Sequence, residues 1–84
     1  MNKKDIQEII IGLIKEITGI RPHEYEMELR FHEIGMEQYH VNRLIDILQM
    51  ELNFDFDDEL SFNIDSTINQ AIEITTSQYN FNYL

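Results

Sequence analysis

The sequence predicts a small all-α protein. Three stretches carry apolar residues at the three- and four-residue spacing of one helix face. Each stretch also has its own start or stop signal. With 84 residues the chain has room for one domain with one small core. Its apolar fraction of 43% is ordinary for a folded protein, so we expect the helices to pack on one another rather than stay disordered.

The first helix is expected over residues 3–18. Its inward stripe consists of Ile6, Ile9, Ile10, Leu13, Ile14 and Ile17. Asn2 can cap the N-terminus, with Asp5 three residues on as in a capping box. Gly19 supplies the left-handed residue after the last turn, where Ile20 can fold back on the helix. Because the polar face is mixed rather than basic, we expect this helix to pack in a core rather than on a membrane.

A long connection, residues 19–36, follows, with helical-turn character around His23–Glu28. Connections of this length are uncommon in a compact domain, so we expect this one to wrap the bundle and contribute buried residues. The apolar residues available as anchors are Ile20, Met27, Leu29, Phe31 and Ile34. The glutamates of this segment lack a histidine at ligand spacing, which favours a solvated face over a metal site.

A second helix is expected over residues 37–52, after a turn at Gly35. Its inward residues are Val41, Leu44, Ile45, Leu48 and Leu52. Glu37 places a negative charge at the positive end of the helix dipole, although it caps a helix less well than Asp. The opposite face exposes the candidate partner-binding residues Tyr39, Arg43, Ile47 and Met50. Tyr and Met are common at interfaces, but single exposed apolar residues are also ordinary, and both interpretations stay open.

The segment after the second helix alternates aromatic and acidic residues. Phe54 and Phe56 are expected to turn inward along an extended link. Asp57 or Asp58 can cap a single helical turn that runs through Leu60. This segment therefore predicts a short helix between the second and last long helices.

A last helix is expected over residues 66–77, with Asp65 or Ser66 as its cap. Its inward stripe is Ile68, Ala71, Ile72 and Thr75. Residues 79–84 alternate polar and large apolar side chains, which is a strand-like pattern, and we assign them to a tail after a domain of residues 1–78. The tail can pack back on the bundle, pair with another chain or form a disordered end.

Composition limits the function classes. Sixteen acidic residues against six basic ones disfavour binding along a nucleic-acid backbone. Such a charge attracts a basic partner surface, or serves only to keep a small protein soluble. The absence of cysteine excludes disulfides and thiol catalysis. Without a cleavable signal or an apolar run of roughly 20 residues, we expect a cytoplasmic monomer that does not enter a membrane.

No arrangement typical of an enzyme occurs in the sequence. It contains no HExxH motif, glycine-rich phosphate loop or zinc-ligand spacing. The histidines His23, His32 and His40 are scattered, and no nucleophile is spaced with a base. We therefore expect neither catalysis nor a metal.

The stretch from Phe31 to Tyr39 resembles the turn before the second helix of acyl and peptidyl carrier proteins. In that family the turn reads aromatic or Leu, any residue, acidic, Leu, Gly, apolar, Asp, Ser, Leu. The residues that fit are Phe31, Glu33, Ile34, Gly35 and Met36, whereas Asp-Ser-Leu has become Glu37-Gln38-Tyr39. Leu52–Glu59 and Ile64–Ile68 resemble the family's link to its short third helix and its entry to the last helix. The resemblance covers residues 6–76.

The resemblance implies a four-helix carrier-protein bundle with a long first loop and a short third helix. The family's serine carries phosphopantetheine through a phosphodiester, which needs a hydroxyl. Gln38, at the equivalent position, has an amide, so no cofactor is expected.

Three functions are compatible with this sequence. The first is a degenerate, non-enzymatic carrier protein that acts as an adaptor or regulator docking on a biosynthetic enzyme. The second is a true acyl, aminoacyl or peptidyl carrier of fatty-acid, polyketide or nonribosomal-peptide-type biosynthesis. It requires that Gln38 replaces a natural serine or that phosphopantetheine is attached elsewhere. The third is an unrelated helical interaction module.

Overall fold

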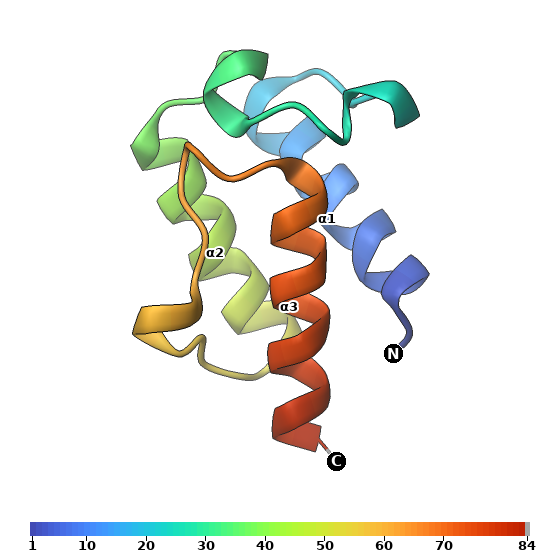
Figure 1. Ribbon diagram of the computed structural model, residues 1–84, viewed down its shortest axis with the longest axis vertical. Helices are drawn as coiled ribbons and strands as arrows, with labels where there is room; N and C mark the ends of the chain where they lie inside the picture. The colour runs from blue at the N-terminus through green and yellow to red at the C-terminus, as the bar shows by residue number, and fades with distance from the viewer. Residues whose placement is uncertain (84) are drawn as a thin grey trace.

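A computed structural model describes residues 1–83 and consists of three α-helices joined by two long connections (Figure 1). The α-helices are α1 (Lys3–Thr18), α2 (Gln38–Leu52) and α3 (Ile68–Tyr83). Three short 3-10 segments lie between them: η1 (Glu24–Glu26), η2 (Phe31–Ile34) and η3 (Asp58–Leu60). The all-α class is confirmed. The position expected for a short third helix is occupied by η3, so residues 1–83 contain three α-helices rather than four.

The three α-helices surround one hydrophobic core. In Figure 1, α3 crosses in front, with α1 behind it on one side and α2 on the other. The helices bury Ile6, Ile10, Ile14, Val41, Leu44, Leu48, Ile68 and Ile72, each 0% exposed. The connections add Met27, Phe31, Met36, Phe54, Phe56 and Phe62. Removal of this apolar surface from water is the main driving force for folding, and the connections carry a large share of it.

Both ends of α1 are built as the sequence predicts. The Asp5 N–H donates to Asn2 Oδ1 at 2.9 Å, which completes the capping box. Gly19 adopts the left-handed conformation with φ of 81°. Ile20, however, does not fold back on the helix and is 72% exposed. The Thr18 hydroxyl accepts the Ile20 N–H at 3.2 Å and holds the backbone in a turn that leaves this side chain in solvent.

The expectations for the two connections are confirmed in part, because Leu29 and Ile34 are only half-buried and Ile20 is exposed. Met27 and Phe31 are buried anchors of the first connection, and η1 is the helical turn expected there. In the second connection Phe54 and Phe56 turn inward, each 7% exposed. Asp57 caps η3, where its Oδ1 accepts the Glu59 N–H at 2.9 Å.

Backbone hydrogen bonds tie the first connection to the start of α3. The first two N–H groups of α3, those of Ile68 and Asn69, donate to the carbonyl oxygens of Leu29 and Met27 at 3.1 and 2.9 Å. Two further bonds run in the opposite direction, from the N–H groups of Phe31 and His32 to the carbonyl oxygens of Ser66 and Ile64, both at 3.1 Å. Because the first N–H groups of a helix lack partners within it, this pairing determines where α3 begins.

Thr67, rather than the expected Asp65 or Ser66, caps α3. The Gln70 N–H donates to Thr67 Oγ1 at 3.0 Å, and the Thr67 N–H donates to Gln70 Oε1 at 2.8 Å. This reciprocal pair is a capping box. The Ser66 hydroxyl accepts a backbone N–H within the preceding turn instead. The helix therefore begins at Ile68, two residues later than predicted.

The C-terminal helix also extends further than predicted. It continues past residue 77 and includes residues 79–83 of the stretch assigned to a tail, while Leu84 lies outside the described residues. Thr75, Tyr79 and Tyr83 follow one another at four-residue spacing, which extends the inward stripe of α3 by two turns. The alternating pattern that suggested a strand therefore also contains a helical period.

Tyr83 fastens this extension to the end of α2. Its hydroxyl donates to the carbonyl oxygen of Leu52 at 3.3 Å and to that of Asn53. The ring of Tyr83 stacks on that of Tyr79, with ring centroids 4.8 Å apart. These contacts satisfy carbonyl groups at the C-terminus of α2, which have no partner within the helix, and they favour helix over strand at residues 79–83.

Replacing the buried Thr75 with valine is expected to stabilise the protein. Thr75 is 0% exposed, and its hydroxyl has no hydrogen-bond partner among the described residues. Valine keeps the shape and removes an unsatisfied polar group, which is worth about 1 kcal/mol. The change is measured as a higher urea midpoint for Thr75→Val. The matched control is Thr76→Val, which deletes a hydroxyl bonded to the Ile72 carbonyl at 2.7 Å and should give no gain. A lower midpoint for Thr75→Val would contradict this prediction.

Candidate functional site

The start of α2 is placed by a turn whose apolar residues are buried. Phe31 is 0% and Met36 is 2% exposed, and Gly35 between them has a left-handed φ of 86° that favours glycine. This turn leaves Glu37 as the N-cap residue and Gln38 as the first residue of α2. Gln38, which the resemblance to carrier proteins aligns with the family's serine, is exposed at the start of α2.

Glu37 makes no side-chain cap bond at this helix start. Instead His40, three residues on, turns back, and its Nδ1 accepts the Glu37 N–H at 2.9 Å. This bond reproduces half of a capping box with an imidazole in place of a carboxylate. The ring of Tyr39 lies beside that of His40, with ring centroids 4.0 Å apart.

Gln38 connects α2 to the second connection, residues 53–67. Its Nε2 donates to Asn42 Oδ1 at 2.9 Å, and its Oε1 accepts the Ile64 N–H at 3.3 Å. A serine side chain ends two bonds closer to the backbone, so it lacks the length of this amide. Gln38 thus has a structural role at the start of α2.

Two more glutamines, Gln49 and Gln78, bind the same connection. The contacts of Gln38, Gln49 and Gln78 with this connection were not expected from the sequence. Gln49 Oε1 accepts the Phe56 N–H at 2.9 Å, and Gln78 Oε1 accepts the Asp57 N–H at 3.1 Å. Gln38 and Gln49 are eleven residues apart, about three turns of α2, so they share one helix face. This spacing is a signal in the sequence, but it does not identify the backbone groups that the amides bind.

Three of the four predicted partner-binding residues form an exposed stripe. Tyr39 is 63% and Met50 is 80% exposed, and Arg43 is exposed as well. Positions 39, 43 and 50 lie on one face because their spacings of four and seven match the helical period. Ile47 was expected to be exposed on the same face, but it is half-buried and packs against the core, and its part in partner binding stays a prediction.

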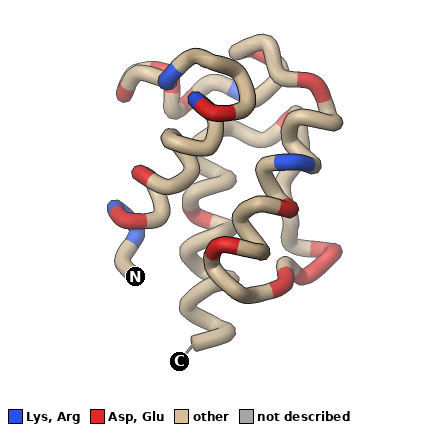
Figure 2. Tube along the Cα trace, turned by 180° about the vertical axis from the view of Figure 1, so that it is seen from behind, with Lys and Arg blue, Asp and Glu red and all other residues tan. Residues whose placement is uncertain are grey.

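Arg43 forms no ion pair within residues 1–83. The pair with Asp46 that the three-residue spacing allows is not formed. Figure 2 shows the molecule from behind with its charged residues coloured, and acidic positions dominate α2 and the connection that follows it. The guanidinium group therefore stands as a single cation on a largely anionic surface.

The chemistry available at this site is hydrogen bonding, charge and apolar contact. Within the described part of the chain, no group of three His, Cys, Asp or Glu side chains is arranged to hold a metal ion. Nor does any helix among residues 1–83 have the length and apolar character needed to cross a membrane. The α2 stripe of Tyr39, Arg43 and Met50 is thus suited to contact with another molecule's surface.

No protein-family model, curated protein or solved structure matches the chain. The resemblance to carrier proteins rests on the turn at residues 31–39 and on the order and spacing of the elements.

Gln38→Ser should loosen the second connection where it meets α2. The variant loses the acceptor for the Ile64 N–H, and a hydrogen bond of this kind contributes about 0.5–1.5 kcal/mol. We expect a lower urea midpoint and faster hydrogen exchange at the Ile64 amide. Gln38→Glu keeps an oxygen of equal reach and serves as the control, with exchange at Ile64 close to that of the parent. Equal exchange at Ile64 in Gln38→Ser and the parent would show that the amide does not hold this connection.

Proposed function

We propose that this chain is a carrier-protein-like domain that has lost the prosthetic arm and acts as a non-enzymatic adaptor, docking on a biosynthetic enzyme through α2. The observation that carries this proposal is that Gln38 has no hydroxyl and that its side chain is held by hydrogen bonds. Its amide cannot form a phosphodiester, and both of its polar atoms are engaged by Asn42 and Ile64. Phosphopantetheine is therefore not part of the proposed function.

The neighbouring hydroxyl does not replace the missing serine. Tyr39 is the closest candidate, but it follows Gln38 by one residue and is rotated by about 100° around the helix. Its ring also lies against that of His40. A transferase that recognises the start of α2 would thus meet the amide of Gln38 rather than the phenol.

Without an arm, the affinity for a partner has to come from the surface of α2. Tyr39 and Met50 present apolar groups that are 63% and 80% exposed, and such residues are frequent energetic anchors at interfaces. Arg43, with no internal ion pair among the described residues, is available to a carboxylate of the partner. The surface fits a partner that has apolar pockets on either side of an acidic group.

The protein should not become phosphopantetheinylated. We expect incubation with coenzyme A and a broad-specificity phosphopantetheinyl transferase to leave the intact mass unchanged, because α2 lacks a hydroxyl at its first residue. Gln38→Ser is the companion variant, and a mass increase there would support the alignment with the family's serine. A phosphopantetheine adduct on the parent protein would overturn the adaptor proposal in favour of a true carrier.

The docking proposal predicts a specific loss of partner binding. Tyr39→Ala combined with Met50→Ala should abolish retention of the native enzyme partner in a pull-down, while the far-UV circular dichroism spectrum stays unchanged. Arg43→Glu should slow association, with a difference that shrinks as salt is added. Tyr25→Ala is the matched control, since Tyr25 is 80% exposed but lies in η1. Retention of the same partner by all variants would exclude α2 as the docking surface.

A further inference from the structure

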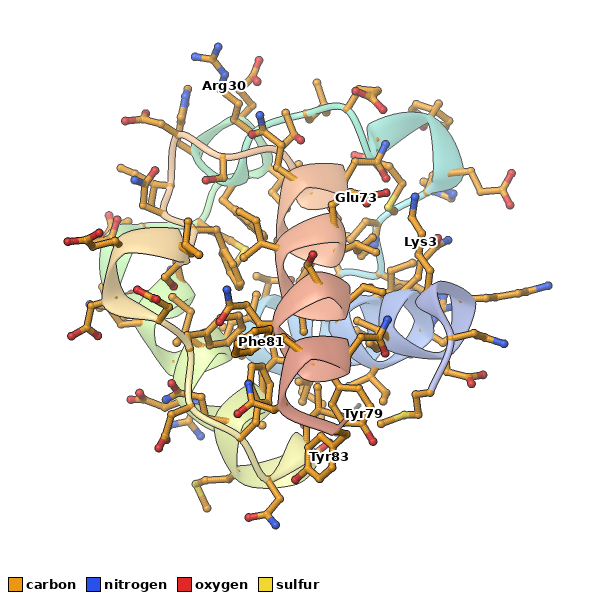
Figure 3. All side chains as sticks on the ribbon, turned by 60° about the horizontal axis from the view of Figure 1, so that its bottom comes forward. Lys3, Arg30, Glu73, Tyr79, Phe81 and Tyr83 are labelled. Carbon is orange, nitrogen blue, oxygen red and sulfur yellow. The ribbon has the colours of Figure 1, made fainter. Side chains whose placement is uncertain are left out.

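A groove that the α2 stripe does not reach runs along the outer side of α3. It lies between this helix and η3, and it consists of two adjoining depressions that share Leu60, Ser77 and Gln78. The first depression extends to Glu59 and Glu73, and the second extends to the turn before η3 and to Phe81. In Figure 3, Phe81 lies on the side of α3 that faces η3, away from Tyr79 and Tyr83. None of the α2 stripe residues lines either depression.

The groove exposes two large apolar side chains. Phe81 is 82% and Leu60 is 56% exposed, and both line the second depression. Phe81 follows Gln78 and Ser77 at three- and four-residue spacing, so these three residues form the α3 wall. Tyr79 and Tyr83, by contrast, pack toward the core and the end of α2. The extension of α3 to Tyr83 therefore serves two surfaces, one inward and one that faces the groove.

The polar residues around Leu60 and Phe81 are all acidic or neutral. Asp55, Asp57, Glu59 and Glu73 line the two depressions. After Arg43 the chain contains eight acidic residues and no Lys, Arg or His. Lys3 pairs with Glu73 at the far end of the groove (Figure 3), so the carboxylates next to η3 have no cation among the residues that line the groove.

We propose that this groove binds a cationic amphipathic helix of a partner protein. Two apolar side chains of that helix contact Leu60 and Phe81, and flanking Lys or Arg side chains meet Asp55, Asp57 and Glu59. The groove follows about two turns of α3, roughly 12 Å, which is the length over which a docked helix presents residues i, i+4 and i+7.

Charge decides between the possible occupants. A second copy of this chain carries a net charge of −10 and would bring like charges together. Nucleic acid and anionic lipid surfaces are repelled for the same reason. A basic segment is attracted from a distance, and the apolar floor then adds contact area. The proposal does not depend on the resemblance to carrier proteins or on docking through α2.

The test uses a dye-labelled synthetic peptide with Leu on one helical face and Lys on the other, titrated with the full chain at about 0.15 M salt. We expect saturable binding in fluorescence anisotropy. Leu60→Ser combined with Phe81→Ser should weaken it by roughly tenfold, because two anchor side chains are lost. The matched control, Ile20→Ser with Tyr25→Ser, removes one exposed aliphatic and one exposed aromatic residue from the first connection and should leave the affinity unchanged.

A peptide of the same composition with its Leu and Lys order scrambled separates groove binding from plain charge attraction. The amphipathic peptide should shift the backbone amide signals of residues 59–61 and 73–82, and the scrambled peptide should not. Equal binding of the two peptides, no binding of either, or equal loss in the two double variants would overturn the proposal. Phe81→Ser alone, in the last turn of α3, repeats the test if the double variant loses its helical spectrum.

Discussion

The structure depends on closing a core that three helices cannot close by themselves. The two connections supply all the buried phenylalanine side chains of residues 1–83: Phe31 from the first, and Phe54, Phe56 and Phe62 from the second. The ring of Phe31 lies against that of Phe62, with centroids 5.7 Å apart, so the two connections meet inside the core. A connection that carries core residues has to be held in one conformation, because its backbone loses as much conformational freedom as a helix does.

Hydrogen bonds to the connections provide that restraint without a sheet. On one side, the pairing of residues 27–32 with residues 64–69 satisfies the first N–H groups of α3 and fastens the first connection. On the other side, the amides of Gln38, Gln49 and Gln78 accept backbone N–H groups of the second connection. Each such bond adds only about 1 kcal/mol, but together they place the aromatic residues of both connections over the helices. Gln38 is therefore part of the fold.

The molecule presents two surfaces of different chemistry. The α2 stripe combines apolar groups with the single cation Arg43, whereas the groove beside α3 combines Leu60 and Phe81 with carboxylates and neutral polar side chains. Because the two surfaces differ in charge, the partners proposed for them differ in charge as well. The α2 stripe lies on one helix, and the groove lies between α3 and η3.

The sequence by itself determined the all-α class, the bounds of α1, most of the inward residues of the three helices, and the burial of Phe54 and Phe56. The burial of Ile11 was not predicted. These properties are local, since they follow from apolar periodicity and from caps a few residues away. Only the tertiary structure decided where α3 begins and ends. Its start depends on carbonyl groups of residues 27–29, and its last turns depend on Tyr83 reaching the end of α2. The hydrogen bonds of Gln38 and the exposure of Phe81 also depend on the tertiary structure. Each is determined by the distant segment that lies next to α2 or α3.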